Sequence, residues 1–122
     1  MTIGEAVGRC DRLKPNGYDR EDKIRWLSDL DGAAVREIFS VHEGQSPDFD
    51  GYGPETPEET PLLIPAPYEE VYVKYLFAQI DFHNAEFARY NNSAAMFQMA
   101  YNAFADAYNR THRPRQEHRV RI

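Results

Sequence analysis

The carboxylates between Asp48 and Glu59 come closest to a known chemical pattern in this sequence. Asp48, Asp50 and Glu59 fall at the first, third and twelfth positions of a calcium-binding loop. Tyr52 stands at the fifth position, where a ligand belongs, and two prolines interrupt the segment. No helix can enter the loop at Asp48, as the calcium motif requires. The spacing therefore does not predict a metal site.

The other titratable residues also lack a spacing that would bring them together. Asp29 and Asp31 are two residues apart on an expected helix, which places them on different faces and predicts a solvated surface. Cys10 belongs to an apolar stripe and is predicted to be a buried thiol. The histidines stand in no metal-ligand spacing, and His83 is the one expected to touch a packed face; they are His42, His83, His112 and His118. We expect a non-enzymatic protein with no catalytic, cofactor-binding or metal site.

The distribution of charge is more informative than its sum. The chain has 122 residues, the size of one domain, and a net charge of −6. Residues 110–122 hold five arginines and one glutamate, a net charge of +4, which leaves −10 for residues 1–109. An acidic body would repel phosphates, so specific recognition of nucleic acid is not expected. A basic tail on an acidic body suits docking on the acidic surface of another chain.

The sequence carries no sign of export or of membrane insertion. Its single cysteine cannot form a disulfide within the chain, which suits a reducing cytoplasm. The opening residues have neither a basic start nor a long apolar run, and no stretch approaches the ~18 apolar residues of a membrane span. We therefore expect a protein made in the cytoplasm and used there or in an assembly built there.

Apolar periodicity and capping residues predict an all-α fold of four main helices. Thr2 and Glu5 form a capping box ahead of the first apolar stripe, and Asp19 is a cap for the second. Pro67 suits the first turn of the third helix, and Ser93 would cap the fourth. The expected helices cover residues 2–14, 19–42, 68–90 and 93–109, and the expected core comprises Ile3, Val7, Leu27, Ile38, Tyr72, Leu76, Ile80, Phe97, Tyr101 and Phe104.

Two segments lie outside this helical pattern. Residues 43–67 are rich in proline and glycine, and a loop of this length is usually functional or disordered. We expect its acidic part to be mobile. Its apolar part, Leu62, Leu63 and Ile64, is expected to lie in a groove or to pair with a strand, and to bind a partner. The second segment is the basic tail, residues 111–122, which follows a helical domain of residues 1–110. Its expected contacts with a partner come from Arg113, Arg115, Arg119, Arg121 and Ile122.

Several segments of the chain together resemble a known class of proteins. They are Leu62-Leu63-Ile64-Pro65-Ala66-Pro67-Tyr68, Tyr90-Asn91-Asn92-Ser93 with Met96-Phe97, and Tyr108-Asn109-Arg110 with His112. Thr2-Ile3-Gly4-Glu5-Ala6-Val7 and the stretch from Ile24 to Asp31 fit the same pattern. On these segments the chain resembles small structural proteins encoded among the head genes of prophages in Gram-positive bacteria, which are similar to the head–tail connector (adaptor) proteins of long-tailed bacteriophages.

The resemblance implies a structural role in the virion neck. Connectors of this class are helical bundles that form a ring, usually of twelve copies, between the portal protein and the downstream tail or neck protein. An extended arm or tail of each subunit reaches the portal or a neighbouring subunit. Two other roles remain open: another tail-completion or assembly protein of a phage, or an unrelated helical protein-binding module.

Overall fold

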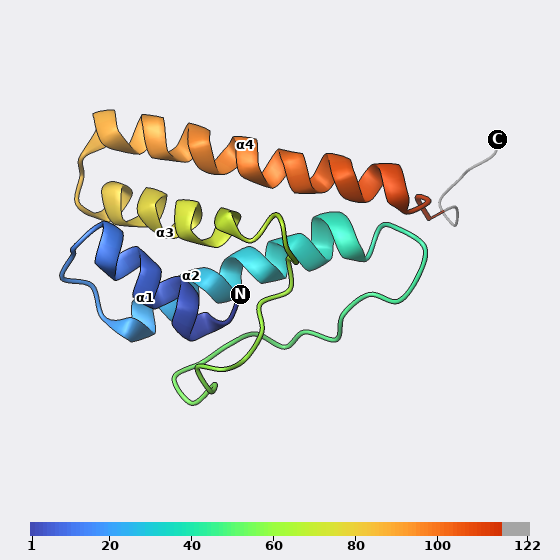
Figure 1. Ribbon diagram of the computed structural model, residues 1–122, viewed down its shortest axis with the longest axis horizontal. Coiled ribbons are helices and arrows are strands. Elements are labelled where there is room, and N and C mark those ends of the chain that lie inside the picture. Colours follow the sequence, from blue (N-terminus) through green and yellow to red (C-terminus); the bar gives the residue numbers. More distant parts are fainter. Residues whose placement is uncertain (116–122) are drawn as a thin grey trace.

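The computed structural model describes residues 1–115, and within them the fold is all-α, as the sequence predicts. Four α-helices and one π-helical segment follow one another along the chain (Figure 1). They are α1 (Ile3–Leu13), α2 (Arg20–Ala34), the π-helix η1 (Val35–Phe39), α3 (Glu70–His83) and α4 (Phe87–Thr111). No helix of the described part is long and apolar enough to cross a membrane.

Helix α3 lies at the centre of the bundle. It contacts α1 and α2 on one side and α4 on the other, and α4 runs along it as the outermost helix (Figure 1). The middle of the loop between η1 and α3 passes beneath α1 and α2, on the side away from α4. Because α3 is covered on both sides, its sequence is apolar on most of its circumference, whereas α4 buries fully only Tyr101 and Phe104.

The first turn of α1 is completed by the loop. The predicted capping box is present, with the Thr2 hydroxyl accepting from the Glu5 N–H and the Glu5 carboxylate accepting from the Thr2 N–H. The next two backbone donors, of Ile3 and Gly4, bond to the carbonyls of Thr60 and Glu58 at 3.0 and 2.9 Å. A Cβ atom on Gly4 would lie 3.3 Å from that Glu58 oxygen and 2.9 Å from its carboxylate. The absence of a side chain at Gly4 thus permits the close approach.

The second helix ends as a π-helix. The prediction of one helix over 19–42 is correct to Ala34, after which Val35–Phe39 has the wider winding. The Ser40 N–H bonds to the Val35 carbonyl at 2.9 Å, five residues back. Trp26 of α2 is buried and stacks on His83 with ring centroids 5.2 Å apart.

The boundary between the last two helices differs from the prediction. Helix α3 ends at His83 rather than near Tyr90, and the expected break at Asn91–Ser93 lies inside α4. The turn is a Schellman motif: the Glu86 N–H bonds to the Asp81 carbonyl, and the Ala85 N–H bonds to the Phe82 carbonyl. Ala85 takes the left-handed conformation, with φ of 58°, where glycine is the usual residue. Without a glycine or proline there, the sequence carries no strong stop signal.

The predicted core is confirmed at nine of its ten positions. Phe97 is the exception, because it is half-buried at the edge of the bundle and packs against Tyr75 with ring centroids 4.9 Å apart. The buried set is Ile3, Val7, Leu27, Ile38, Tyr72, Leu76, Ile80, Tyr101 and Phe104, joined by Cys10 as predicted and by residues of the long loop.

Candidate interaction surfaces

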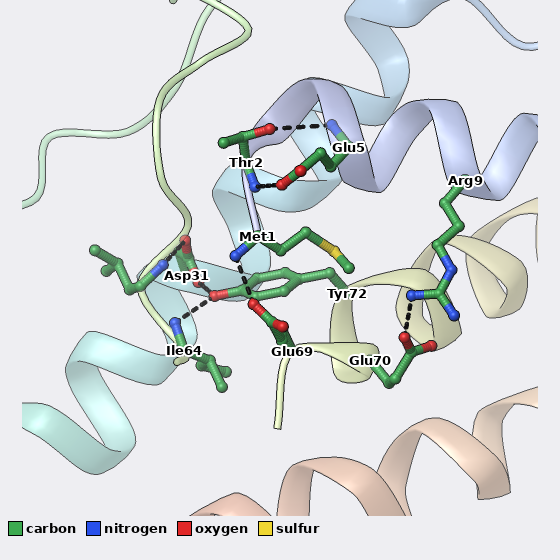
Figure 2. A network of polar contacts seen from close by, with 10 residues as sticks. Met1, Thr2, Glu5, Arg9, Asp31, Ile64, Glu69, Glu70 and Tyr72 are labelled. Carbon is green, nitrogen blue, oxygen red and sulfur yellow. Dashed lines mark hydrogen bonds and ion pairs between the residues drawn. The ribbon is translucent and has the colours of Figure 1, made fainter. Parts of the chain in front are cut away.

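A buried carboxylate, Asp31, joins the loop to the helices. It is fully buried and accepts three hydrogen bonds: from the Tyr52 hydroxyl at 2.5 Å, the Tyr72 hydroxyl at 2.5 Å and the Leu63 N–H at 3.1 Å. The Tyr72 hydroxyl in turn accepts from the Ile64 N–H at 2.6 Å (Figure 2). The prediction that Asp31 lies on a solvated helix face is therefore wrong. It holds residues from α2, the loop and α3 together.

Burial decides the protonation behaviour of this cluster. It raises the pKa of the Asp31 carboxyl above its ordinary value, and the three hydrogen bonds oppose that rise only in part. Burial and the neighbouring Asp31 also raise the pKa values of Tyr52 and Tyr72. Both phenols therefore remain protonated donors at any physiological pH. Asp31 and Tyr72 are buried, Tyr52 is half-buried, and their polar atoms are hydrogen-bonded, which is the arrangement of a structural polar network.

The apolar part of the loop belongs to the domain itself. Leu62 and Ile64 are buried, and Leu63 is half-buried against the same core. These residues do lie in a groove, as expected, but it is a groove of their own chain, so Leu62 and Ile64 are not a surface for a partner. The acidic part is also anchored, because the backbone N–H of Tyr52 bonds to the Ser28 hydroxyl at 2.9 Å and Arg20 binds the Glu58 carboxylate at 2.8 Å. The loop is thus integral to the fold.

The start of the basic tail also folds back on the domain. The Arg115 guanidinium donates to the Ser40 carbonyl at 2.7 Å, and its backbone N–H bonds to the Val41 carbonyl at 2.9 Å. Arg113 remains exposed, with Glu43 4.0 Å away. Arg115 is thus engaged within its own subunit, contrary to the expectation that the whole tail is offered to a partner. Arg119, Arg121 and Ile122 lie outside the described residues.

His42, the one buried histidine among residues 1–115, holds this segment in place. Its two ring nitrogens lie 2.6 Å from the Ile38 carbonyl and 2.6 Å from the Asn109 side-chain oxygen. Tyr108 packs on its ring edge to face, with centroids 4.9 Å apart. Sequence spacing did not single out His42, because its side-chain partners, Asn109 and Tyr108, come from the end of α4, far away in the chain.

A groove between α2 and α4 is both acidic and aromatic. It encloses about 350 Å³ over Tyr75 of α3, with Asp29 and Glu37 on the α2 and η1 side and Phe97 and Tyr101 on the α4 side. The Tyr101 hydroxyl donates to Glu37 at 2.6 Å, and burial raises its pKa. Carboxylates beside aromatic rings form a favourable environment for a cationic side chain, above all a guanidinium.

The outward face of α4 carries no charge over most of its length. From Tyr90 to Ala105 the sequence contains no Asp, Glu, Lys or Arg. The exposed side chains of that stretch are short, amide-bearing or thioether-bearing, and Met96 and Met99 are 47% and 67% exposed. They are Asn91, Asn92, Ala95, Met96, Gln98, Met99, Asn102 and Ala103. A solvated helix face normally carries charge, so the lack of charge on this exposed face is unusual.

Within residues 1–115, the remaining groups to consider are the Cys10 thiol and the side chains that can bind a metal ion. Burial raises the pKa of the Cys10 thiol to about 11, which keeps it protonated and unreactive. Among residues 1–115, no three histidine, cysteine or carboxylate side chains lie close enough to hold a metal ion. The surfaces of interest are therefore the acidic groove, the outward face of α4 and the basic tail.

Comparison with known proteins identifies no relative. The chain matches no protein-family model, and neither a curated protein nor a solved structure is detectably similar to it.

Proposed function

We propose that this protein is a head–tail connector, or adaptor, of a long-tailed bacteriophage: a non-enzymatic subunit of a ring between the portal and the tail. The observation that carries the proposal is the separation of charge, with −10 on residues 1–109 and +4 on residues 110–122. Such a chain attracts further copies of itself when the tail of one meets the body of the next. The segments that resemble connector proteins point to the same role.

The acidic groove is the receiving surface that fits this proposal. Asp29 and Glu37 supply carboxylates, and the neighbouring rings supply faces on which a guanidinium can stack. The partner residues are Arg119 and Arg121 of a neighbouring copy, with Ile122 as a small apolar anchor. Exposed ion pairs contribute only about 0–1 kcal/mol each, so the stability of a ring comes from repetition of the contact around it.

The experiment is electron microscopy of the purified protein, alone and with its portal protein, combined with light scattering. We expect closed rings whose mass falls as salt is added, because the contact is largely electrostatic. The double substitution Arg119→Glu and Arg121→Glu should abolish the rings. The matched control is Arg12→Glu with Arg25→Glu, which removes the same charge from exposed sites on α1 and α2.

Two results would contradict the proposal. One is a protein that forms no ring with or without the portal protein at low salt. The other is a ring that persists unchanged in the tail variant. If the protein instead binds a tail-tip or capsid component without forming a ring, the alternative of another assembly protein is favoured.

A further inference from the structure

We infer that the outward face of α4 is a contact surface for a second copy of this chain, with the two α4 helices packed antiparallel about a two-fold axis. The inference does not rest on the proposed connector role, and it concerns a different face from the tail contact. Its basis is the spacing, size and charge of the exposed residues of α4.

The spacing is that of a helix–helix seam. Ala88, Asn92, Ala95, Met99, Asn102 and Asp106 are all exposed and follow one another at steps of four, three, four, three and four. Alternating steps of four and three residues keep one line of side chains facing a partner helix, as in a coiled coil. The same helix turns its other face, with Tyr101 and Phe104, to its own core. Helix α4 therefore has two packing faces, and the chain itself covers only one.

The residue types fit a partner helix better than water. Small residues in the seam allow two helix backbones to approach closely, and flexible methionines fill irregular gaps. Met99 is 67% exposed, so a monomer leaves most of this apolar side chain in water. Asn91, Asn92 and Asn102 can form hydrogen bonds across a helix pair, so their burial would not leave polar groups unsatisfied.

The distribution of charge favours a second copy of this chain as the partner at the outward face of α4. The body of the protein, residues 1–109, carries −10, so two copies repel each other over most of their surfaces. The stretch from Tyr90 to Ala105 is free of charge, and two copies can meet there without bringing like charges together. The charged residues that flank this stretch, Arg89 and Asp106, have opposite signs.

The antiparallel direction follows from the order of those residues. With the two-fold axis near Phe97, Ala95 of one helix faces Met99 of the other, and Asn92 faces Asn102. Each small residue then meets a large one, and each amide meets an amide. The same register brings Arg89 near Asp106 of the second copy. In a parallel pair, Met99 would instead face Met99 and crowd the seam. Asp106 would face Asp106, and the two carboxylates would repel each other at the C-terminal end of the seam.

The expected pair is weak. A single helix seam buries less surface than the ~1,200 Å² or more of most stable interfaces, so dissociation in the micromolar range is expected. The two-fold pair closes on itself and does not build a ring, for which a separate head-to-tail contact is needed. None of the seam residues lines the acidic groove, and of the exposed residues from Tyr90 to Ala105 only Gln98 borders it.

The test is sedimentation of the full chain over a range of concentrations, in high salt that screens the tail contact. We expect a monomer–dimer equilibrium whose dissociation constant rises at least about tenfold in Met99→Lys, because a charge is then buried in the seam. Gln45→Lys, which adds the same charge at an exposed site in the loop, should leave the constant unchanged. Circular dichroism checks that both variants remain folded.

Disulfide formation reports the direction of the helices. When Ala95→Cys and Met99→Cys proteins are mixed under mild oxidation, an antiparallel pair gives mainly the mixed disulfide, whereas a parallel pair gives the two homodimers. Native Cys10 does not interfere, because it is fully buried. A monomer at all concentrations, a dimer insensitive to Met99→Lys, or a predominance of homodimers would each overturn the inference. Loss of rings in the tail variant with the dimer retained would separate this result from the connector proposal.

Discussion

At the scale of single residues, Asp31 connects three parts of the fold. Its carboxylate accepts from Tyr52, Tyr72 and the Leu63 N–H, and in Figure 2 it lies where α2, the loop and α3 meet. The residue types alone did not reveal this role. An aspartate on a helix is usually solvated, and its three donors come from positions 21 to 41 residues further along the chain.

We predict that Asp31 makes stability depend on pH. Because the folded pKa lies above the ordinary value of 3.8, this contribution to stability is complete below that value and is lost as the pH rises through the folded pKa. Asp31→Asn removes the titration, so the stability of the wild type relative to the variant should fall over that interval. At neutral pH the variant should still lose about 1–3 kcal/mol, since an amide cannot accept from all three donors.

The measurement is urea unfolding of both proteins at a series of pH values from about 3 to 8, which spans the ordinary range of carboxyl titration. Asp29→Asn is the matched control, because Asp29 is exposed on the same helix. A constant difference between wild type and Asp31→Asn at every pH would show that the carboxyl does not titrate with a raised pKa.

A second residue-scale prediction concerns Ala85, whose φ of 58° is unfavourable for a residue with a Cβ atom. Ala85→Gly should stabilise the protein by up to about 1 kcal/mol, since relief of this strain outweighs the entropy that glycine adds to the unfolded chain. Ala103→Gly, at an exposed helical position, should instead destabilise by about 0.5–1 kcal/mol. Thermal unfolding of the two variants gives the comparison, and destabilisation by both would contradict the assigned turn.

At the scale of elements, the helices were predictable and their ends were less so. The capping box of Thr2 and Glu5 and the apolar stripe after it located α1 closely, because both signals are local. The turn between α3 and α4 was misplaced because Asn91-Asn92-Ser93 has the composition of a break, whereas Asn84-Ala85-Glu86 does not. Ser93 is accommodated inside α4, where its hydroxyl donates to the buried Asp81 at 2.8 Å.

The long loop was recognised as unusual, but its apolar residues were predicted to bind another chain, whereas they pack against their own. Its apolar residues have no period, so the sequence could not say whether they cover their own core or that of another chain. In the structure they pack against the core of their own chain, and Ile64 is fully buried. Deleting residues 51–59 should therefore destabilise the bundle through loss of the Tyr52 and Glu58 contacts.

The element-scale prediction follows from this burial. Ile64→Ala should cost about 2–5 kcal/mol, the range for a large aliphatic side chain removed from a core. Leu63→Ala should cost clearly less, because Leu63 is half-buried. Urea unfolding measures both. Equal small losses would mean that the loop is an accessory segment and that its packing contributes little.

At the scale of the whole molecule, charge and exposed apolar area point to different contacts. The acidic body and basic tail favour an electrostatic contact, whereas the outward face of α4 favours a contact without charge. The first was apparent from the sequence. The second needed the structure, because only the placement of Tyr101 and Phe104 in the core shows which side of α4 is left uncovered.

We therefore predict two contacts with opposite responses to salt. Arg119→Glu with Arg121→Glu should weaken assembly at low salt and leave dimerisation at high salt unaffected. Met99→Lys should have the reverse effect, as judged by light scattering at both salt concentrations. If each variant abolished both kinds of assembly, a single combined interface would be indicated.

The bonds between the loop and the start of α1 also set an order of events during synthesis. Ile3 and Gly4 find their backbone partners at Thr60 and Glu58, more than fifty residues later in the chain. At a translation rate of about 5–20 residues per second, those partners leave the ribosome some seconds after α1 does. During that interval α1 has an incomplete first turn and an uncovered apolar stripe. The nascent chain is thus exposed to chaperones and proteases until the loop has emerged.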